Sequence, residues 1–499
     1  MKSSRVSNFM RIFFITAFLF AMGFGRGGPQ LASGQSSTDE RPNIVIFLVD
    51  DLGWKDIGSF GSSFYETPNI DALAAEGMSF QQAYAASPVC SPTRASIMAG
   101  KNPARMNTTD WFGAPQPENV QNHWTRNKPL KPASYTPYLP LEEKTIAEAL
   151  KEHGYTTFFA GKWHLGDEEK YWPKNHGFDI NKGGFSSGAP RSYFAPYSNP
   201  RLKDGPNGEH LPHRLAQETA SFIKKHQDQP FLAYLSFYSV HNPKQAHLDL
   251  INKYKEKKSE LGLVNKWGKE GARKVRLVQT DPVYAGMVDA MDQAVGTVMQ
   301  QLRDLGIEEN TIVIFFSDNG GLSTSEGHPT SNMPLRAGKG WMYEGGIREP
   351  MIVKWPGVTK PGSSTLEPVI SMDLYPTILE SAGLPLEPRQ HVDGESLLPL
   401  LKGRPMDRGP LYFHYPHYGN QGGSPASAIR KGNYKLIEFY EDKPVELYNI
   451  ARDISENNNL APENPTLVNE LQGMLDDWKR SVDAQLPTEN GKNQNNNNK

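Results

Sequence analysis

The sequence contains a single cysteine, Cys90, at the start of the segment CSPTR, which runs on into ASIMAGK. Pro92 suits the first turn of a helix and the residues after it can continue one, so Cys90 is predicted to lie at a helix N-terminus. Free N–H groups and the helix dipole favour an anion there. Arg94 adds a guanidinium that suits a sulfate or phosphate. The pattern therefore predicts a cysteine nucleophile beside an oxyanion site.

Four further groups of reactive side chains each follow a predicted strand. They are Asp50 with Asp51, Lys162 with His164, His241, and Asp318 with Asn319. Each group is ordinary by itself, because an aspartate after a strand usually caps a turn and a lone histidine is usually a satisfied loop residue. The hypothesis of a shared site rests on all of them occurring together with Cys90.

The elements that must position these residues alternate along the chain. Apolar runs predict strands at 43–49, 156–160, 231–237 and 311–316, and amphipathic stretches predict helices at 69–76, 144–153 and 284–305. This alternation predicts an α/β fold with a large, mostly parallel mixed sheet flanked by helices. Ligands of such sheets bind at the carboxyl ends of the strands, where the reactive groups stand.

The pattern changes after residue 384. Short strands are predicted at 411–415, 434–440 and 446–448, followed by a helix at 467–481. We therefore predict a signal peptide at 1–34, a catalytic domain at 41–383, a C-terminal α+β subdomain at 384–486 with a small antiparallel sheet plus a helix, and a disordered Asn-rich tail at 487–499.

Composition and the N-terminus limit the possible partners. The 499 residues carry 53 Lys and Arg against 55 Asp and Glu, which argues against a nucleic-acid partner. One cysteine excludes an intramolecular disulfide and a cysteine-based zinc or iron–sulfur site. Basic residues precede an apolar run at 12–24 that is shorter than the roughly 20 residues of a membrane span. We expect a secretory signal peptide, export to the periplasm or the medium, and no stable membrane insertion, with an N-terminal anchor as the alternative.

Five sequence blocks carry a resemblance to a known family. C-x-P-x-R at Cys90, with NIVIFLVDDLGW, GKWHLG, SDNGG and AGKGWMYEGGIREP in this order, resembles the type I sulfatases of the alkaline-phosphatase-like superfamily. The resemblance runs from Pro42 to about Leu460. It implies an alkaline-phosphatase-like fold and a maturation enzyme that oxidises Cys90 to Cα-formylglycine, whose hydrated aldehyde is the nucleophile.

The resemblance also assigns a calcium site to four side chains and to the modified residue 90. The four side chains are Asp50, Asp51, Asp318 and Asn319. Their oxygen atoms on short side chains suit a hard cation, so the residue types by themselves indicate the same kind of site.

The remaining roles in sulfate ester hydrolysis follow from the resemblance as well. Arg94 with calcium neutralises the sulfate, and Asp318 accepts the proton of the attacking hydroxyl. His241 with Lys339 protonates the departing oxygen, and His164 then takes a proton from residue 90 as sulfate leaves. The sulfate oxygens are held by Lys162 and Lys339.

The segment SVHNPKQAH offers a second histidine, His247, for the role given to His241. Its position directly after the strand favours His241. For the substrate, the long stretches 102–138 and 171–214 are rich in aromatic and basic residues, among them Trp111, Tyr193 and Tyr197. They favour a sulfated carbohydrate, and a galactose- or uronate-containing polysaccharide fragment is the first candidate. The alternatives are a phosphonate monoester or phosphodiester hydrolase of the same superfamily and a non-catalytic binder of sulfated glycans.

Overall fold

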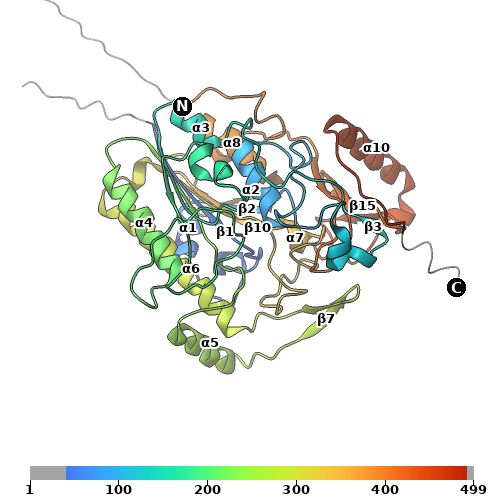
Figure 1. Cartoon of the computed structure of the whole chain (residues 1–499), viewed down its shortest axis with the longest axis horizontal. Coiled ribbons are helices and arrows are strands. Elements are labelled where there is room, and N and C mark those ends of the chain that lie inside the picture. Colours follow the sequence, from blue (N-terminus) through green and yellow to red (C-terminus); the bar gives the residue numbers. More distant parts are fainter. Residues whose placement is uncertain (1–40, 492–499) are drawn as a thin grey trace, which may run out of the picture. The chain divides into compact units, whose positions relative to one another are not determined.

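The computed structural model describes residues 41–491 (Figure 1). The predicted signal peptide and residues 492–499 lie outside the described residues. Within residues 41–491, no helix is long and apolar enough to cross a membrane.

A large mixed sheet forms the centre of the fold, as predicted. In the described residues its strands lie in the order β11 (Ser363–Thr365), β2 (Met78–Tyr84), β10 (Arg348–Lys354), β9 (Thr311–Ser317), β1 (Asn43–Val49), β6 (Phe231–Ser236), β4 (Thr156–Gly161) and β5 (Ile180–Lys182), with β12 (Val369–Ile370) beside β2. The neighbours from β9 to β5 are parallel, whereas β10 runs antiparallel to both β9 and β2. The central strands are buried on both faces, which explains why their sequences are continuous apolar runs.

Helices cover both faces of this sheet. Successive side chains of a strand point to opposite sides, and in the central strands both sets are apolar and must be buried. Val45, Phe47 and Val49 of β1 pack into a core shared with α1 (Pro68–Glu76), α4 (Leu211–Lys225) and α6 (Pro282–Asp304). Ile44, Ile46 and Leu48 pack into a second core with α2 (Cys90–Ala99), α3 (Ile146–Glu152) and α8 (Leu374–Ser381). The two groups of helices lie on opposite sides of the strands (Figure 1).

A smaller antiparallel sheet follows, also as predicted. It consists of β13 (Leu411–Tyr415), β14 (Ala426–Lys431), β15 (Tyr434–Phe439) and β16 (Glu446–Asn449), and α10 (Pro465–Ser481) packs against β14 and β15 through Val468, Leu471 and Leu475. The sequence patterns gave no indication of β14, because its residues ASAIRK are mostly small or polar and lack the β-branched run of a typical strand.

The predicted disordered tail begins too early. Thr488–Glu489 form β17, which pairs with β3 (Leu130–Lys131), and the side chain of Asn490 donates to the carbonyl oxygens of Arg126 and Lys128. These bonds hold in place a segment whose composition alone favours disorder. The remaining elements are a hairpin of β7 (Trp267–Glu270) and β8 (Arg273–Arg276), and the helices α5 (Leu248–Glu260), α7 (Glu344–Ile347) and α9 (Leu398–Leu401).

Candidate active site

The predicted acidic residues meet at the carboxyl ends of β1 and β9. These strands are parallel with Val49 opposite Ser317, so Asp50 and Asp51 emerge directly beside Asp318. One carboxylate oxygen from each of these three aspartates lies within 4.8 Å of the others, and all three side chains are buried. Asn319 joins them, because its amide donates to Asp51 Oδ1 at 2.8 Å.

Three buried cations face these three carboxylates. Lys162 Nζ lies 2.7 Å from Asp50 Oδ2, and Lys339 Nζ lies 2.6 Å from Asp51 Oδ1. The third pair joins Arg94 Nε to Asp318 Oδ2 at 2.7 Å. Counted by residue type, the cluster is therefore charge-balanced, with three basic and three acidic side chains, and a divalent cation would make it net positive, as an anionic substrate requires.

Burial and pairing act on the pKa values of this cluster in opposite directions. Burial raises the pKa of Asp50 well above its usual range, although Lys162 opposes the rise. Burial also acts to raise the pKa of Asp51, but Lys339 and His241 outweigh it and hold that pKa below its usual range. Lys339 keeps its proton, since Asp51 raises its pKa despite the burial.

Cys90 is the first residue of α2, at a helix N-terminus as predicted. Its Sγ lies 3.4 Å from His164 Nδ1, and the Ser91 hydroxyl lies 3.2 Å from the same nitrogen. His164 Nε2 lies 3.1 Å from the carbonyl oxygen of Phe112. Because a carbonyl only accepts, Nε2 carries the imidazole hydrogen, and Nδ1 is an acceptor that faces both residue 90 and the Ser91 hydroxyl. Burial, with Lys162 and Arg94 nearby, lowers the pKa of His164 well below its usual value, so the ring is neutral.

His164 occupies this position because the backbone makes room for it. Its φ is 56°, in the left-handed region, and a Cβ on Gly188 would lie 2.5 Å from the His164 ring. A glycine at 188 is therefore required for the ring to sit against residue 90.

Of the two candidate histidines, His241 lies beside the acidic cluster. Its Nε2 lies 3.7 Å from Asp51 Oδ2, and its Nδ1 donates to the carbonyl of Asn242 at 2.8 Å. Burial and Lys339 lower the pKa of His241 to about 4. His247 stands elsewhere, with its ring centroid 4.8 Å from that of His210.

A pocket of about 440 Å³ opens onto the cluster. Four of the predicted catalytic residues line it, namely Cys90, His164, His241 and Lys339. Arg94 and Lys162 are buried behind this lining, Lys162 with none of its surface exposed, and they contact the aspartates instead. The two long stretches expected to shape the pocket also contribute to its lining, through Trp111 and Phe112 of 102–138 and through residues 186–189 of 171–214. The sequence patterns did not indicate Glu326, Asn420 and Gln421, which complete the polar part of the lining.

No sequence signal could have found Asn420 and Gln421, because they come from the C-terminal part and reach the pocket only through tertiary packing. Both donate to Glu326 Oε1, at 3.1 and 2.9 Å. Of the aromatic residues in the long loops, Trp111 and Phe112 line the pocket, whereas Tyr193 and Tyr197 are buried in the core. The expectation that these loops present aromatic side chains to a ligand therefore has support at Trp111 and Phe112 but not at the two tyrosines.

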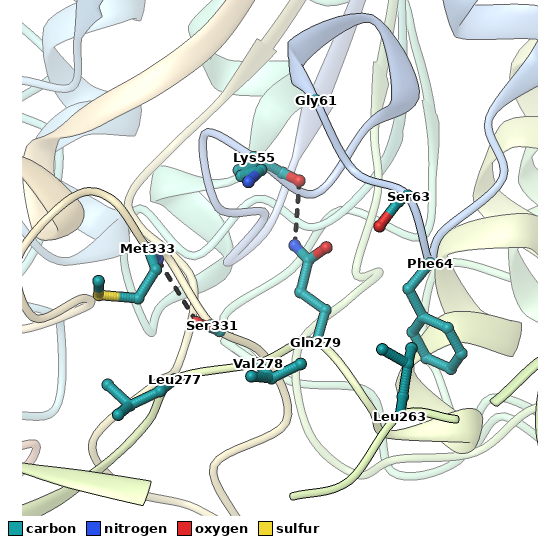
Figure 2. A pocket seen from close by; sticks show the side chains of 10 residues that line it. All are labelled: Lys55, Gly61, Ser63, Phe64, Leu263, Leu277, Val278, Gln279, Ser331 and Met333. Atoms are coloured by element: carbon teal, nitrogen blue, oxygen red, sulfur yellow. Dashed lines mark hydrogen bonds between the residues drawn. The ribbon is translucent and has the colours of Figure 1, made fainter. Parts of the chain in front are cut away.

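A second, smaller cavity of about 140 Å³ contains none of the predicted residues (Figure 2). It lies between the segment that follows β1 and the residues after β8, where Gln279 donates to the carbonyl of Lys55. Its lining combines apolar side chains such as Phe64, Leu263 and Met333 with Lys55 and two serines, and none of the groups predicted to do chemistry reaches it.

A family model described as sulfatase matches residues 42–384, more than half of the chain. The chain belongs to the sulfatase family. It is a sulfuric ester hydrolase with an alkaline-phosphatase-like fold. A second model, described as the C-terminal part of N-sulphoglucosamine sulphohydrolase, matches residues 337–481 of this sulfatase.

Individual relatives agree with the family match. This sulfatase is 34% identical to a sulfatase of Formosa agariphila, with 88% of each chain covered. It is 32% identical to the N-acetylgalactosamine-6-sulfatase of Canis lupus familiaris, with 81% of this chain and 72% of the relative covered. The solved structure of Ps i-CgsB in complex with k-i-k-neocarrahexaose superposes with a TM-score of 0.71 at 30% identity, covering 88% of this chain and 92% of that one.

The fold by itself does not separate sulfate from phosphorus chemistry. The phosphonate monoester hydrolase of Agrobacterium radiobacter matches with a TM-score of 0.64 at 19% identity, over 89% of this chain and 96% of that one. That likeness extends to the fold alone.

The acidic cluster of this sulfatase fits a hard divalent cation. Asp50 Oδ1 and Asn319 Oδ1 are buried without a hydrogen-bond partner among the described residues. The amide of Asn319 is already used by Asp51 and Gly320, so its oxygen is the free atom. Two oxygens that bind one Ca²⁺ ion can lie at most about 4.6–5.2 Å apart, and the three aspartate oxygens, all within 4.8 Å of one another, are close enough to share an ion.

Proposed function

We propose that this sulfatase is exported and hydrolyses the sulfate esters of a sulfated polysaccharide or of its oligosaccharides, using Ca²⁺ and a Cα-formylglycine formed from Cys90. The observation that carries this proposal is the pocket in which residue 90 meets an accepting histidine nitrogen, a protonated lysine and a charge-balanced acidic cluster. Each part has a distinct task in the hydrolysis of a sulfate ester.

Asp50, Asp51, Asp318 and Asn319 would hold the calcium ion, together with residue 90. When bound, Ca²⁺ neutralises charge on the sulfate ester, and the hydrated formylglycine supplies the attacking hydroxyl. Asp318 is our candidate to accept the proton of that hydroxyl, and its bond to Arg94 holds the carboxylate in place.

His164 would take the second proton from residue 90. Its Nδ1 faces residue 90 as an acceptor, and its lowered pKa keeps it neutral and ready for a proton at physiological pH. The bond from Nε2 to the Phe112 carbonyl fixes this tautomer, as an orienting partner does in other acid–base sites.

Lys339 and His241 would serve the departing oxygen. Lys339 is protonated and lines the pocket, so it can hold a sulfate oxygen. His241 is neutral in the absence of substrate, but a bound anion next to it favours the protonated ring, which then donates to the leaving alcohol. Lys162, which is buried behind the pocket lining and paired with Asp50, would add positive charge that stabilises the sulfate group.

Several features support a carbohydrate substrate. The pocket presents an indole, two amides and a carboxylate, namely Trp111, Asn420, Gln421 and Glu326. Aromatic faces suit sugar rings, and amide and carboxylate groups pair with sugar hydroxyls. Two of the proteins named above, the N-acetylgalactosamine-6-sulfatase and Ps i-CgsB with its bound k-i-k-neocarrahexaose, act on or bind a sugar by their names. The predicted signal peptide supports export to where polysaccharides are found.

The first test is mass spectrometry of the peptide that contains residue 90, from protein made in its native host or with a formylglycine-generating enzyme. We expect the mass of formylglycine. The same preparation should release sulfate from sulfated oligosaccharides, and the Cys90→Ala variant should release it only at the background rate.

Phosphodiesters and phosphonate monoesters are the controls in this assay. Dominant hydrolysis of either would contradict the proposal and favour the phosphorus alternative. An unmodified thiol in a preparation that nevertheless hydrolyses sulfate esters would contradict the formylglycine assignment.

A further inference from the structure

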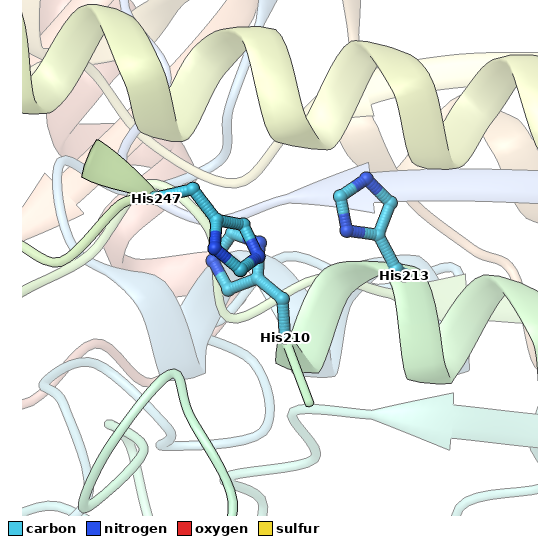
Figure 3. A group of neighbouring side chains, drawn as sticks. All are labelled: His210, His213 and His247. Atoms are coloured by element: carbon cyan, nitrogen blue, oxygen red, sulfur yellow. The ribbon is translucent and has the colours of Figure 1, made fainter. Parts of the chain in front are cut away.

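Three histidines meet away from the pocket, at the N-terminal ends of two helices. His210 precedes α4, His213 lies in its first turn, and His247 precedes α5 (Figure 3). One ring nitrogen from each lies within 4.8 Å of the others. Among the described residues, this trio and the acidic cluster are the two groupings with the donor atoms to hold a metal ion.

His210 carries the strongest sign of a missing ligand. Its side chain is 4% exposed, yet neither ring nitrogen has a hydrogen-bond partner among the described residues. Leaving a buried polar group unpaired is costly, so such groups are usually satisfied by a partner, a water or an ion. Burial and the neighbouring histidines lower the pKa of His210 to about 3, so the ring is neutral, as metal binding requires.

The hydrogen bonds of His213 determine which of its ring nitrogens is free to face His210 and His247. Gln293 on α6 uses its amide to donate to Asp289 Oδ1 at 2.8 Å, so its Oε1 is the acceptor that lies 3.2 Å from His213 Nε2. His213 Nε2 therefore carries the hydrogen, and Nδ1 keeps its lone pair. Figure 3 shows one nitrogen of His213 turned toward α6 and the other toward His210 and His247.

The bond from His213 Nε2–H to an oxygen of Gln293 is the kind of bond that a metal-ligating histidine usually makes. Such a histidine donates its other N–H to an oxygen, which fixes the tautomer and orients the ring. Here the chain of bonds runs from His213 through Gln293 to the carboxylate of Asp289. The carboxylate is itself held by Lys253 and Tyr254, at 2.7 and 2.9 Å.

We propose that His210, His213 and His247 form a binding site for a transition-metal ion, with Zn²⁺ as the ion that three neutral imidazoles suit best. Zinc–nitrogen bonds of about 2.0–2.1 Å place tetrahedral ligands about 3.3 Å apart, so the rings must approach slightly. His247 is exposed and its ring can turn to do so. Water would complete the four ligands.

Such an ion would tie together segments that surround the active site. His247 ends the segment that begins with His241, and Phe194, next to Tyr193, stacks on the His210 ring with centroids 4.7 Å apart. Tyr193 in turn donates to the carbonyls of Tyr238 and His241. The metal would thus stabilise the loop that carries His241 without taking part in hydrolysis.

The test titrates Zn²⁺ into the full-length, tag-free protein, with excess Ca²⁺ present to saturate the acidic cluster. We expect the parent to bind one more Zn²⁺ per chain than His247→Ala in equilibrium dialysis. Zn²⁺ should also raise the thermal midpoint of the parent but not that of the variant. Co²⁺ in place of Zn²⁺ should give the parent, and not the variant, the visible absorption of a tetrahedral site.

Two further variants complete the design. Gln293→Leu leaves the three histidines in place but removes the acceptor for His213 together with the amide bond to Asp289, and it should weaken Zn²⁺ binding by about 10–100-fold. His226→Ala changes a histidine at the far end of α4 and should bind like the parent. Equal Zn²⁺ binding by the parent and His247→Ala would overturn the proposal. Since none of these readouts requires sulfate hydrolysis, their result is independent of the proposed function.

Discussion

His241 and Lys339 share one side of the pocket, and they differ in how firmly each holds a proton. The pKa of Lys339 lies above its usual value, whereas that of His241 is lowered to about 4. Proton donation by His241 therefore depends on the charge of the bound substrate. The demand for that proton depends on how basic the departing oxygen is.

The His241→Gln variant tests this role through the leaving group. For a sulfated sugar, whose alkoxide is a poor leaving group, we expect kcat to fall by about 10²–10⁴-fold. For 4-nitrophenyl sulfate, whose phenolate leaves without a proton, the loss should be much smaller. Steady-state kinetics on both substrates measures the difference, and an equal loss on the two would contradict proton donation by His241.

His176 gives the folded protein a sensitivity to acid that is unrelated to catalysis. Its side chain is buried with neither ring nitrogen partnered among the described residues, and burial lowers its pKa to about 4. The folded state thus binds a proton more weakly than the unfolded state, whose histidine pKa is about 6.5. Stability must fall as the pH drops through this window.

The His176→Phe variant should remove this part of the acid sensitivity. Between pH 7 and pH 4.5 the parent should lose about 2 kcal/mol of unfolding free energy through this histidine, and the variant should not. Urea unfolding at the two pH values measures it. A parent and a variant with the same loss would show that His176 is solvated or paired in solution.

At the scale of elements, the joint between β4 and β6 positions two of the buried cations. The carbonyl of Ser236 accepts from Lys162 N at 2.8 Å, and Arg94 Nη1 bonds both the Ser236 hydroxyl and the Lys162 carbonyl. Gly161 lies at this joint with φ +101°, and a Cβ there would lie 1.8 Å from the Ser236 oxygen. The strand ends can meet only because residue 161 has no side chain.

Gly161→Ala should therefore cost stability and activity together. Gly154→Ala is the matched control, since its φ is +85° but the nearest atom to an added Cβ is 3.7 Å away. The control should lose only the left-handed strain of about 1–2 kcal/mol and keep its activity. Gly161→Ala should lose more than this and also lower kcat/KM, because Lys162 and Arg94 shift. Thermal unfolding and kinetics of both variants check the prediction, which fails if they behave alike.

At the scale of the whole molecule, a buried ion cluster joins the two sheets. Lys435 of β15 lies 3.1 Å from Glu344 and 2.9 Å from Glu456, and all three side chains are fully buried. Glu344 begins α7, shortly after the segment that carries Lys339. Burial raises the pKa of Glu456 to about 7, although Lys435 opposes the rise.

Lys435→Met should lower the unfolding free energy by about 3–5 kcal/mol, because it leaves two buried carboxylates without their shared cation. Lys431→Met is the control on the next strand: its pair with Glu470 is solvent-exposed and worth less than about 1 kcal/mol. Urea unfolding of the two variants provides the comparison. Similar losses in both would contradict a joining role for the buried cluster.

The sequence by itself determined the fold class and the residues that end its strands. Apolar runs such as 43–49 and the long amphipathic helix at 284–305 are local patterns, and burial on both sides of a parallel sheet leaves a clear trace in them. The rule that ligands bind at the carboxyl ends of the strands then placed Asp50, Asp51, Asp318 and Asn319 together.

Only the tertiary structure decided which of these residues face the pocket and which lie behind it. Arg94 and Lys162 are buried against aspartates, whereas Lys339 reaches the pocket, and no local pattern distinguishes the three. The sequence patterns also could not predict that Glu326 and Asn420 line the pocket, or that His210, His213 and His247 lie together. The physical reason is that periodicity records burial along one element, whereas contacts between distant segments depend on how loops without periodicity pack over the sheet.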